Sequence, residues 1–349
     1  MKRLSALIIT LMLMTMLPAA VARATDELRV LSSDRITPPD LVERFEREEG
    51  IRLRFEYFES PEALAAYLDT RPRGDMALLR GYYVPRLVDN DQLAPLDHRL
   101  LPNLRHLISG EQNTTSDPDR RYSAPYLMGT LGIIYRSELL EGQGFPGWDW
   151  ILDRFAGSAS FAITNQYRDA MGAALIHLGY SYNSTSPVAI GQAAELLRGL
   201  AEHPAFLGFL DPATTLKFLN EKFIYAAVTY NNLAAEAMEE DPGLAFRVPE
   251  GGAVFWSYVY VINKQSSQAE AAHKWLNFLM EPEVAARVST WNRATSPNLA
   301  ARELMPPAIG DNPVLYPPES VWRSAEPARA LDPETEKLFI KFWSQIKIK

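Results

Sequence analysis

The side chains that most often carry catalysis or bind metals are sparse in this chain and follow no pattern that indicates a chemical site. The 349 residues contain no cysteine and only five histidines: His98, His106, His177, His203 and His273. No two of them have the H-E-x-x-H spacing that places two zinc ligands on one face of a helix. We interpret each histidine as a surface or packing residue, and the sequence predicts neither a metal site nor a cofactor.

Motifs for nucleophilic catalysis and for phosphate binding are also missing. The chain has neither a G-x-S-x-G nucleophile elbow nor a G-x-x-x-x-G-K phosphate loop. The letters from Gly142 to Gly147 match G-x-G-x-x-G, but Pro146 interrupts the loop and no clean buried strand precedes it. We interpret this stretch as a surface turn before Trp148 and Trp150. The sequence therefore gives no support for an enzyme.

The elements that could position a binding site begin with an alternation of short strands and helices. Each strand is a short apolar or alternating run, and proline or glycine marks the helix boundaries. This alternation predicts a mostly parallel sheet covered by helices, with ligands bound beyond the carboxyl ends of the strands. Ser32–Thr37 and Arg80–Tyr83 lie at such ends. The expected strands and helices are Leu28–Ser33, Asp40–Glu49, Arg52–Phe58, Pro61–Asp69, Asp75–Leu79 and Val84–Asp89.

A second set of α/β elements follows Tyr122–Arg136, which is expected to be an extended segment crossing to a second lobe. Two α/β lobes joined by extended crossings would enclose a cleft. The length supports this division, because about 325 mature residues exceed one ordinary core. The expected elements are strands Phe161–Thr164, Tyr225–Tyr230, Leu244–Pro249 and Phe255–Ile262, and helices Tyr167–Leu178, Pro187–Ala201, Thr214–Lys222 and Ala234–Glu239.

Phe255–Ala300 forms a compact unit of strand, long helix, short helix and turn. Aromatic and β-branched residues alternate to Ile262, and a helix starting near Ser267–Ala269 then carries one apolar face. The proline of Met280–Glu283 ends this helix and starts the next, Pro282–Thr290.

Residues 1–24 are typical of a cleaved secretory signal. A charged start precedes an apolar segment, Leu4–Leu17, that is too short to span a membrane, and small residues before Ala24 fit a cleavage site. Without cysteine there is no disulfide and no lipid-modified anchor. We expect a soluble exported protein, periplasmic in a bacterium with two membranes.

The charge excludes two classes of partner. Removal of residues 1–24 deletes three basic residues and no acid, which moves the formal net charge from −8 to −11. Such a chain has no electrostatic reason to bind nucleic acid or anionic lipid, and it could favour cationic ligands.

Several stretches stand out together, among them Pro38–Leu41, Gly81–Val84, Tyr122–Tyr126, Leu178–Ser181, Pro249–Ala253, Asn277–Leu279 and Ser296–Ala301. As a set they resemble the bacterial periplasmic spermidine/putrescine-binding proteins that deliver polyamines to ABC transporters. The similarity covers nearly the whole mature chain. It implies a two-lobed α/β periplasmic binding protein fold, with strand-exchanged lobes, a hinge and a central cleft. Lobe 1 would comprise residues 25–132 and 259–297, and lobe 2 residues 133–258 and 298–349.

The resemblance also implies a binding site, taken position by position. In that family aromatic rings enclose the methylene stem of the ligand and carboxylates hold its ammonium ends. Tyr82, Trp256 and Asp169 match family binding positions, and Tyr230 replaces a tryptophan. The predicted ligand-binding residues are Asp34, Arg80, Tyr82, Gln166, Asp169, Tyr230, Trp256 and Tyr258.

Other positions depart from the family pattern, and Arg80 is the most consequential. It replaces a small hydroxyl residue, and a guanidinium close to a ligand ammonium costs about 1–4 kcal/mol. Asp34 and Arg80 could instead pair with each other, and Arg323 is a weaker candidate for the cleft. The remaining departures are Ser33 and Ile36 for aromatics, Asp34 for threonine, Gln166 and Tyr258 for acids, and Ala294 for tyrosine.

The resemblance predicts a monomeric, non-enzymatic solute-binding protein that captures a polyamine by lobe closure and passes it to an ABC permease. One alternative keeps the fold and changes the partner to a membrane signalling protein, such as a diguanylate cyclase or phosphodiesterase. A second alternative is an anionic solute bound through Arg80.

Overall fold

The structure is a computed structural model that describes residues 27–70, 73–108, 117–140, 147–153, 159–249 and 252–347. The expected signal segment 1–24 and the stretch 142–146 of the predicted surface turn lie outside these residues. Within the described ranges, the helices are all too short or too polar to cross a membrane.

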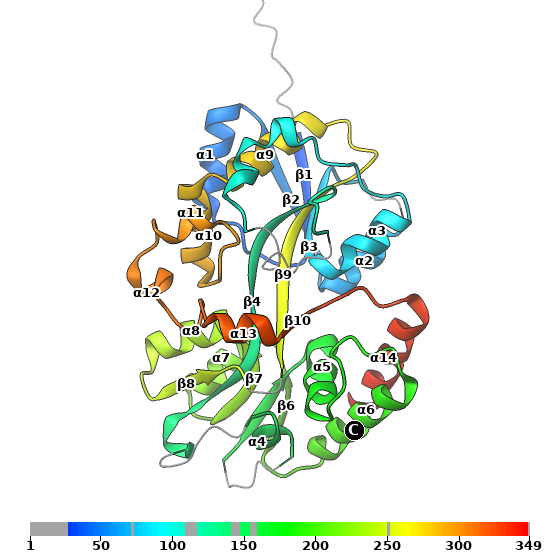
Figure 1. The fold of residues 1–349 in the computed structure, drawn as a ribbon, viewed down its shortest axis with the longest axis vertical. Coiled ribbons are helices and arrows are strands. Elements are labelled where there is room, and N and C mark those ends of the chain that lie inside the picture. The colour runs from blue at the N-terminus through cyan, green and yellow to red at the C-terminus, as the bar shows by residue number, and fades with distance from the viewer. Residues whose placement is uncertain are drawn as a thin grey trace, which may run out of the picture.

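Two lobes share one sheet, and two long strands run from one lobe into the other (Figure 1). The strand order is β2-β1-β3-β9-β4-β7-β5-β6, with β8 on β4 and β10 on β9. Lobe 1 contains β1 (Glu27–Ser32), β2 (Arg52–Tyr57) and β3 (Met76–Arg80). Lobe 2 contains β5 (Phe161–Thr164), β6 (Phe206–Leu210), β7 (Ala226–Tyr230) and β8 (Leu244–Arg247), and the crossing strands are β4 (Ser123–Arg136) and β9 (Ala253–Ile262).

The sheet is parallel at its outer strands and antiparallel at its centre. β1 pairs in parallel with β2 and β3, and β5 with β6 and β7. β4 and β9 pair antiparallel from Ser123 opposite Val261 to Leu131 opposite Val254. The predicted two-lobed fold with strand exchange is confirmed.

The helices of lobe 1 begin and end where local chemistry favours it. Pro39 and Pro61 lie in first turns, where their missing amide hydrogen costs nothing, and the Ser60 hydroxyl accepts a bond from the Ala63 amide. Gly50 ends α1 with a positive φ of 68°. The helices are α1 (Pro39–Glu49), α2 (Pro61–Leu68), α3 (Val84–Asp89), α9 (Ala269–Leu279) and α10 (Pro282–Asn292), with 3-10 turns η1 (Gly81–Tyr83), η2 (His98–Leu100) and η3 (Pro102–His106).

Lobe 2 is covered by a second group of helices, and several of its elements were not anticipated. We predicted neither β6 nor the last helix, and α7 begins two residues before its expected start because Asp211 caps it through the Thr214 amide. The elements are η5 (Ser137–Leu140), α4 (Asp149–Leu152), α5 (Tyr167–His177), α6 (Pro187–Ala201), α7 (Pro212–Asn220), α8 (Asn231–Glu240) and α14 (Pro333–Lys347).

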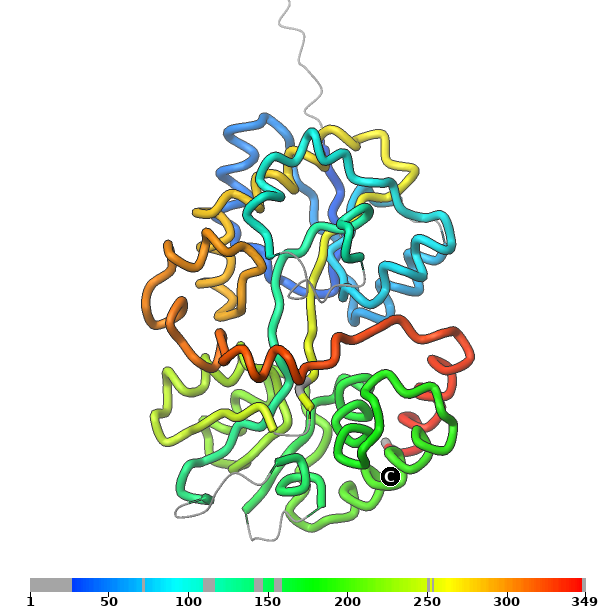
Figure 2. Tube along the Cα trace, in the orientation of Figure 1, coloured from blue at the N-terminus to red at the C-terminus, as the bar shows by residue number. Residues whose placement is uncertain are grey.

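The chain passes between the lobes a third time near its end, as the orange-to-red part of the trace shows (Figure 2). α11 (Leu299–Arg302) packs on α10 of lobe 1, and α12 (Pro307–Gly310) follows it. α13 (Glu319–Ser324) and β10 (Ala325–Pro327) then lie along β9 and lead to α14 in lobe 2.

The lobe boundaries predicted from the sequence stay a proposal, and this packing bears on one of them. Ala301, Met305 and Leu315 form an apolar cluster with Ala285 and Ala286 of α10, and Ala235 of α8 in lobe 2 also belongs to it. The segment packs further on lobe 1 through the contacts of α11 with α10. We therefore propose to move the segment 298–315 from lobe 2 to lobe 1.

Candidate ligand-binding cleft

A cavity of about 400 Å³ lies between the two lobes, within the usual size range of small-molecule sites. We call it the interlobe cavity. Lobe 1 lines it with residues after β1, before α2 and at the end of β3, and lobe 2 with residues after β5, β6 and β7. Its lining includes Ser33, Asp34, Ile36, Glu59, Ser60, Arg80, Asn165, Gln166, Asp211, Tyr230, Asn232, Trp256, Tyr258, Asn292 and Ala294.

The sheet topology explains why these residues meet. Parallel strands present their carboxyl ends at a common edge, and the chain leaves each strand there to enter a helix. Arg80 is the last residue of β3, Tyr230 is the last of β7, and Asp34 follows β1 by two residues. The lobes bring these edges face to face, so the interlobe cavity lies at the strand ends where the sequence predicts the site, and binding there stays a prediction.

Three aromatic residues form a cage at one part of this cavity. Tyr230 and Trp256 meet edge-on with ring centroids 6.1 Å apart, and Trp256 and Tyr258 do so at 5.9 Å. Trp256 and Tyr258 are two residues apart on β9 and so project from the same face of the strand. Tyr230 comes from β7, so both the shared strand and lobe 2 contribute to the aromatic cage.

The Arg80 guanidinium occupies the aromatic cage. Its Cζ lies 4.7 Å from the ring centroid of Tyr258, 5.4 Å from that of Tyr230 and 5.5 Å from that of Trp256. All three distances are within the range of cation–π attraction. The backbone explains the placement, because Arg80 is directly opposite Tyr258 in the β3–β9 pair.

Arg80 is deeply buried, yet none of the described residues accepts a hydrogen bond from it or forms an ion pair with it; its relative exposure is 8%. Burial works against its charged form, but the surrounding tyrosine oxygens and the Asp169 carboxylate favour it. The pKa of the guanidinium is raised well above its ordinary value. The cavity wall therefore contains a permanent positive charge whose N–H donors lack protein acceptors among the described residues.

Asp169 lies behind the aromatic cage instead of lining the interlobe cavity. It is buried in the first turn of α5, where its Oδ1 accepts a hydrogen bond of 2.9 Å from the Tyr182 hydroxyl and its Oδ2 one of 2.5 Å from Tyr230. Burial raises the pKa of both tyrosines, so their hydroxyls stay protonated and donate. The predicted role of Asp169 as a direct ligand contact stays a prediction, and its observed contacts hold Tyr230 in place.

Asp34 lines the cavity and, like Asp169, accepts a hydrogen bond from a tyrosine of the cage. Its Oδ2 accepts hydrogen bonds from the Ser33 hydroxyl at 2.6 Å and from the Tyr258 hydroxyl at 2.8 Å. The alternative that Asp34 pairs with Arg80 is wrong, because no such ion pair forms between these two described residues. Asp34 is therefore available to a cationic ligand group.

Tyr82 lies beside the interlobe cavity, at a polar seam between the lobes. Its ring packs on Tyr83 with centroids 4.5 Å apart, and burial raises the pKa of the Tyr82 hydroxyl. Together with Tyr167 and Arg86 it lines a second cavity of only about 10 Å³. The structure thus places Tyr82 next to the cage but not in the wall of the larger cavity.

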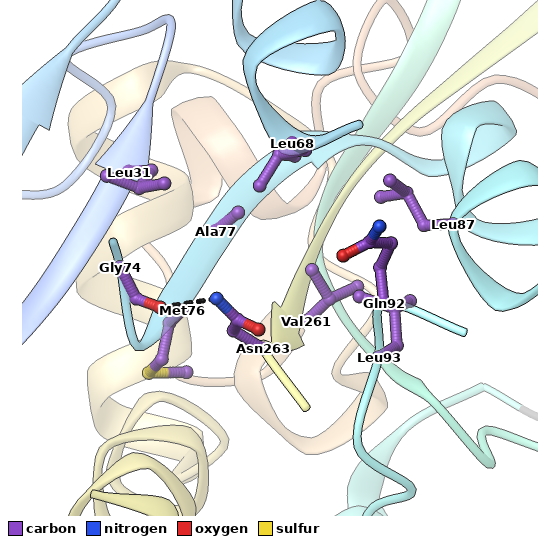
Figure 3. A pocket seen from close by; sticks show the side chains of 10 residues that line it. All are labelled: Leu31, Leu68, Gly74, Met76, Ala77, Leu87, Gln92, Leu93, Val261 and Asn263. Atoms are coloured by element: carbon purple, nitrogen blue, oxygen red, sulfur yellow. Dashed lines mark hydrogen bonds between the residues drawn. The ribbon is translucent and has the colours of Figure 1, made fainter. Parts of the chain in front are cut away.

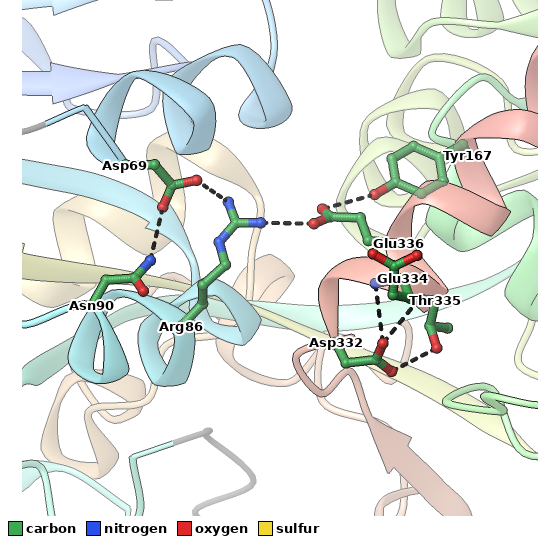
Figure 4. A network of polar contacts seen from close by, with 8 residues as sticks. All are labelled: Asp69, Arg86, Asn90, Tyr167, Asp332, Glu334, Thr335 and Glu336. Carbon is green, nitrogen blue, oxygen red and sulfur yellow. Dashed lines mark hydrogen bonds and ion pairs between the residues drawn. The ribbon is translucent and has the colours of Figure 1, made fainter.

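Arg86 connects the two lobes at this seam (Figure 4). Its Nη1 lies 2.7 Å from Glu336 Oε2 on α14 of lobe 2, and its Nη2 lies 3.2 Å from Asp69 Oδ2 at the end of α2. The Tyr167 hydroxyl is 3.5 Å from the other oxygen of Glu336. We call Asp69, Arg86, Tyr167 and Glu336 the rim network.

The other predicted residues divide clearly. Gln166, Ser33, Ile36 and Ala294 line the interlobe cavity. Arg323 does not, because it lies exposed on α13 and pairs with Glu319 one turn earlier. Its suggested reach into the cleft is wrong.

Sequence reasoning missed two acids that line the cavity, Glu59 and Asp211. Asp211 follows β6, a strand that we did not predict, and it precedes a proline as helix caps often do. That Asp-Pro pair was a usable signal. Glu59 precedes the Ser60 cap of α2, and no local pattern distinguishes it from other exposed acids.

A cavity inside lobe 1 has no features of a site (Figure 3). It measures about 10 Å³ and is enclosed mainly by apolar side chains such as Leu31 and Val261. The amide of Asn263 is engaged with the Gly74 carbonyl at 2.8 Å. This volume barely admits one water molecule and offers too few polar partners to hold it. Among the described residues, no group of three or more histidine, aspartate or glutamate side chains is arranged to hold a metal ion.

Comparisons with known proteins agree on one family. Residues 40–315 match the model of the family described as bacterial extracellular solute-binding protein. The chain is 30% identical over 302 residues to the spermidine/putrescine-binding periplasmic protein of Salmonella typhimurium, covering 86% of this chain and 85% of that protein. It is 28% identical over 345 residues to the putrescine/cadaverine-binding protein of Pseudomonas aeruginosa, covering 95% and 96%.

A solved structure extends the likeness to three dimensions. The spermidine/putrescine ABC transporter substrate-binding protein of Streptococcus pneumoniae superposes with a TM-score of 0.77 at 25% identity. The alignment covers 92% of this chain and all of that one.

Proposed function

The chain belongs to the family of bacterial extracellular solute-binding proteins, and from this we propose that it captures an aliphatic amine of the polyamine kind and delivers it to an ABC transporter. The family comprises solute-binding proteins, and we propose no catalytic step. The relatives at 28–30% identity are named for spermidine, putrescine and cadaverine, which supports this ligand class.

The observation that carries the proposal is the aromatic cage beside Asp34 in the interlobe cavity. Rings of Tyr230, Trp256 and Tyr258 supply apolar area for a methylene stem, while their faces hold the Arg80 guanidinium. Asp34 supplies a carboxylate for charge-assisted hydrogen bonds to an ammonium group. Glu59 and Asp211, one from each lobe, add negative charge to the lining.

The crossing strands suggest how capture would proceed. β4 and β9 join the lobes, so bending them would open the cavity to solvent, and closure would surround the ligand from both sides. Because Tyr230 comes from lobe 2 and Asp34 from lobe 1, a ligand touching both would favour the closed arrangement. Release to the transporter would require the reverse motion.

We also propose that the mature protein acts in the periplasm. The relatives include proteins named as periplasmic, residues 1–24 predict a cleaved signal, and the sequence has no cysteine for lipid attachment. Its action as a monomer and the alternative of a membrane signalling partner both stay predictions. Co-purification with a permease or with a sensor protein would separate the two partners.

Calorimetric titration of the protein with putrescine, cadaverine and spermidine tests the proposal. We expect saturable binding of at least one amine and a rise in melting temperature in its presence. Trp256→Ala should weaken that binding by about 1–2 kcal/mol through lost apolar contact with the methylene stem. If no aliphatic amine produces heat or thermal stabilisation, the proposed ligand class is wrong.

A further inference from the structure

The protein's own cation occupies the cage that would be expected to enclose an ammonium group. Arg80 Cζ lies 4.7–5.5 Å from the centroids of all three rings, and its burial leaves it only 8% exposed. A second positive charge placed at the same rings would be repelled by the guanidinium in a poorly solvated site. The part of the cavity around Arg80 is therefore unfavourable for a ligand ammonium.

The Arg80 guanidinium also carries hydrogen-bond donors that have no protein acceptor among the described residues. It has five N–H groups, and within the described part of the chain no residue accepts a hydrogen bond from them. The nearby carboxylate of Asp169 forms no hydrogen bond or ion pair with Arg80 in the described structure, and its two oxygens accept the hydroxyls of Tyr182 and Tyr230 instead. A buried guanidinium of this kind is best satisfied by a carboxylate, which matches its planar fork and its charge.

The remaining charges of the cavity have the opposite sign. Among the described lining residues Arg80 is the only base, whereas Asp34, Glu59 and Asp211 are acids. The cavity wall thus combines one positive position inside the aromatic cage with several negative ones outside it. Such polarity complements a ligand that is itself positive at one end and negative at the other.

Resting on the proposed amine-binding function, we infer that the preferred ligand is a linear ω-amino carboxylate. Its carboxylate binds the Arg80 guanidinium at the aromatic cage, and its ammonium group binds the acids led by Asp34. A diamine of equal length places its second ammonium against Arg80 and binds more weakly. Arg80 is then the residue that sets ligand specificity at this site.

Four compounds that share one stem separate the contributions of the two ends. Calorimetry on the wild-type protein compares 4-aminobutanoate, 1,4-diaminobutane, butylamine and butanoate. The same four combinations of end groups on five- and six-carbon stems then identify the stem length that the cavity prefers. For the best stem we expect the amino acid to bind at least about tenfold more tightly than the diamine, which corresponds to about 1.4 kcal/mol. We also expect it to bind more tightly than either single-ended compound.

Two variants assign the preference to particular residues. Arg80→Ser removes the guanidinium and should reverse the order, with the diamine binding more tightly than the amino acid. Asp34→Asn is the matched control, because it should weaken both compounds similarly and leave their order unchanged. Should the serine variant fail to fold, Arg80→Lys retains the charge without the planar fork and should reduce the amino-acid preference without reversing it.

The outcomes for the inference and for the proposed function are distinct. A diamine that binds the wild-type protein as tightly as its amino acid, or a preference that survives Arg80→Ser, overturns the inference and leaves the amine-binding function intact. Absence of binding by every amine, with or without a carboxylate, overturns the proposed function as well.

Discussion

Glu336→Gln should loosen the closed arrangement of the two lobes without disturbing either lobe. Glu336 lies on α14 of lobe 2 and contacts Arg86 of lobe 1 at 2.7 Å (Figure 4). The substitution keeps the size of the side chain and removes its charge. It therefore weakens the rim network where the network passes from one lobe to the other.

The size of the effect follows from the burial of the pair. The side chains of Arg86 and Glu336 are only 20% and 19% exposed, so water screens them less than an ordinary surface pair. Exposed ion pairs contribute about 0.2–1 kcal/mol and hydrogen bonds to charged groups about 1.5–3 kcal/mol. We expect a loss of about 1–1.5 kcal/mol, which lowers the ratio of closed to open protein roughly five- to tenfold.

Stopped-flow fluorescence of ligand release measures this change, because ligand leaves when the lobes open and Trp256 in the cage reports its departure. We expect the release rate of Glu336→Gln to rise by the same factor of roughly five to ten. Small-angle X-ray scattering of the ligand-free protein should show a larger radius of gyration for the variant.

Asp69→Asn is the control, since Asp69 pairs with the same guanidinium at 3.2 Å but lies in the same lobe as Arg86. It removes an equal charge and should leave the release rate within about twofold of the wild-type value. Equal acceleration by both variants would refute the idea that the interlobe contact governs release. A folded Glu336→Gln protein with an unchanged rate would refute it too.

The remaining predictions concern stability. Gly129→Ala puts a methyl group 2.4 Å from Trp256 Cζ2, so we expect overpacking to cost about 1–3 kcal/mol and to shift the indole emission in a denaturant titration. Trp275→Ala empties the core under α9 and should lower the free energy of unfolding by about 3–5 kcal/mol in the same assay; a smaller loss would mean that the core collapses around the gap. A hydrogen bond from Arg136 lowers the pKa of Asp241, so this bond stabilises the protein above the unfolded-state pKa and the benefit disappears as pH falls through the folded-state value. Asp241→Asn should therefore melt about 2–4 °C below wild type at neutral pH. In thermal scans the difference should shrink as pH falls below the unfolded-state pKa of about 3.9, and a constant difference would contradict this assignment.

Local chemistry made most of the fold predictable. Helix starts marked by Pro39, Pro61 and Pro187 and the glycine stop at Gly50 lie where the sequence placed them, because these residues restrict the backbone on their own. The last helix was missed although Leu338, Phe339, Phe342, Trp343 and Ile346 have helical spacing. β6 was missed for a physical reason, since it is a short apolar run interrupted by a glycine with a φ of 136°.

The site was predictable as a set of positions but not as a set of contacts. The resemblance led to Arg80, Trp256 and Tyr258, and all three line the interlobe cavity. That Arg80 enters the cage, and that Asp169 is engaged by two tyrosines, depends on how residues from separate lobes meet. The periodicity or residue spacing within one segment cannot predict a contact between side chains from separate lobes.

The crossing strands also have a consequence for the order in which the protein can be built. β3 of lobe 1 pairs along one side with β9, as far as Ile262 of that strand. Helices α9 and α10, which also belong to lobe 1, come still later in the sequence. An emerging chain therefore cannot complete its first lobe until most of the second has been synthesised. Contacts this distant in sequence form slowly, because closing the long loop between them costs conformational entropy before the strand pairing stabilises the chain. The nascent chain should thus stay unfolded until late in synthesis, as the proposed export to the periplasm would require of a chain that crosses the membrane before it folds.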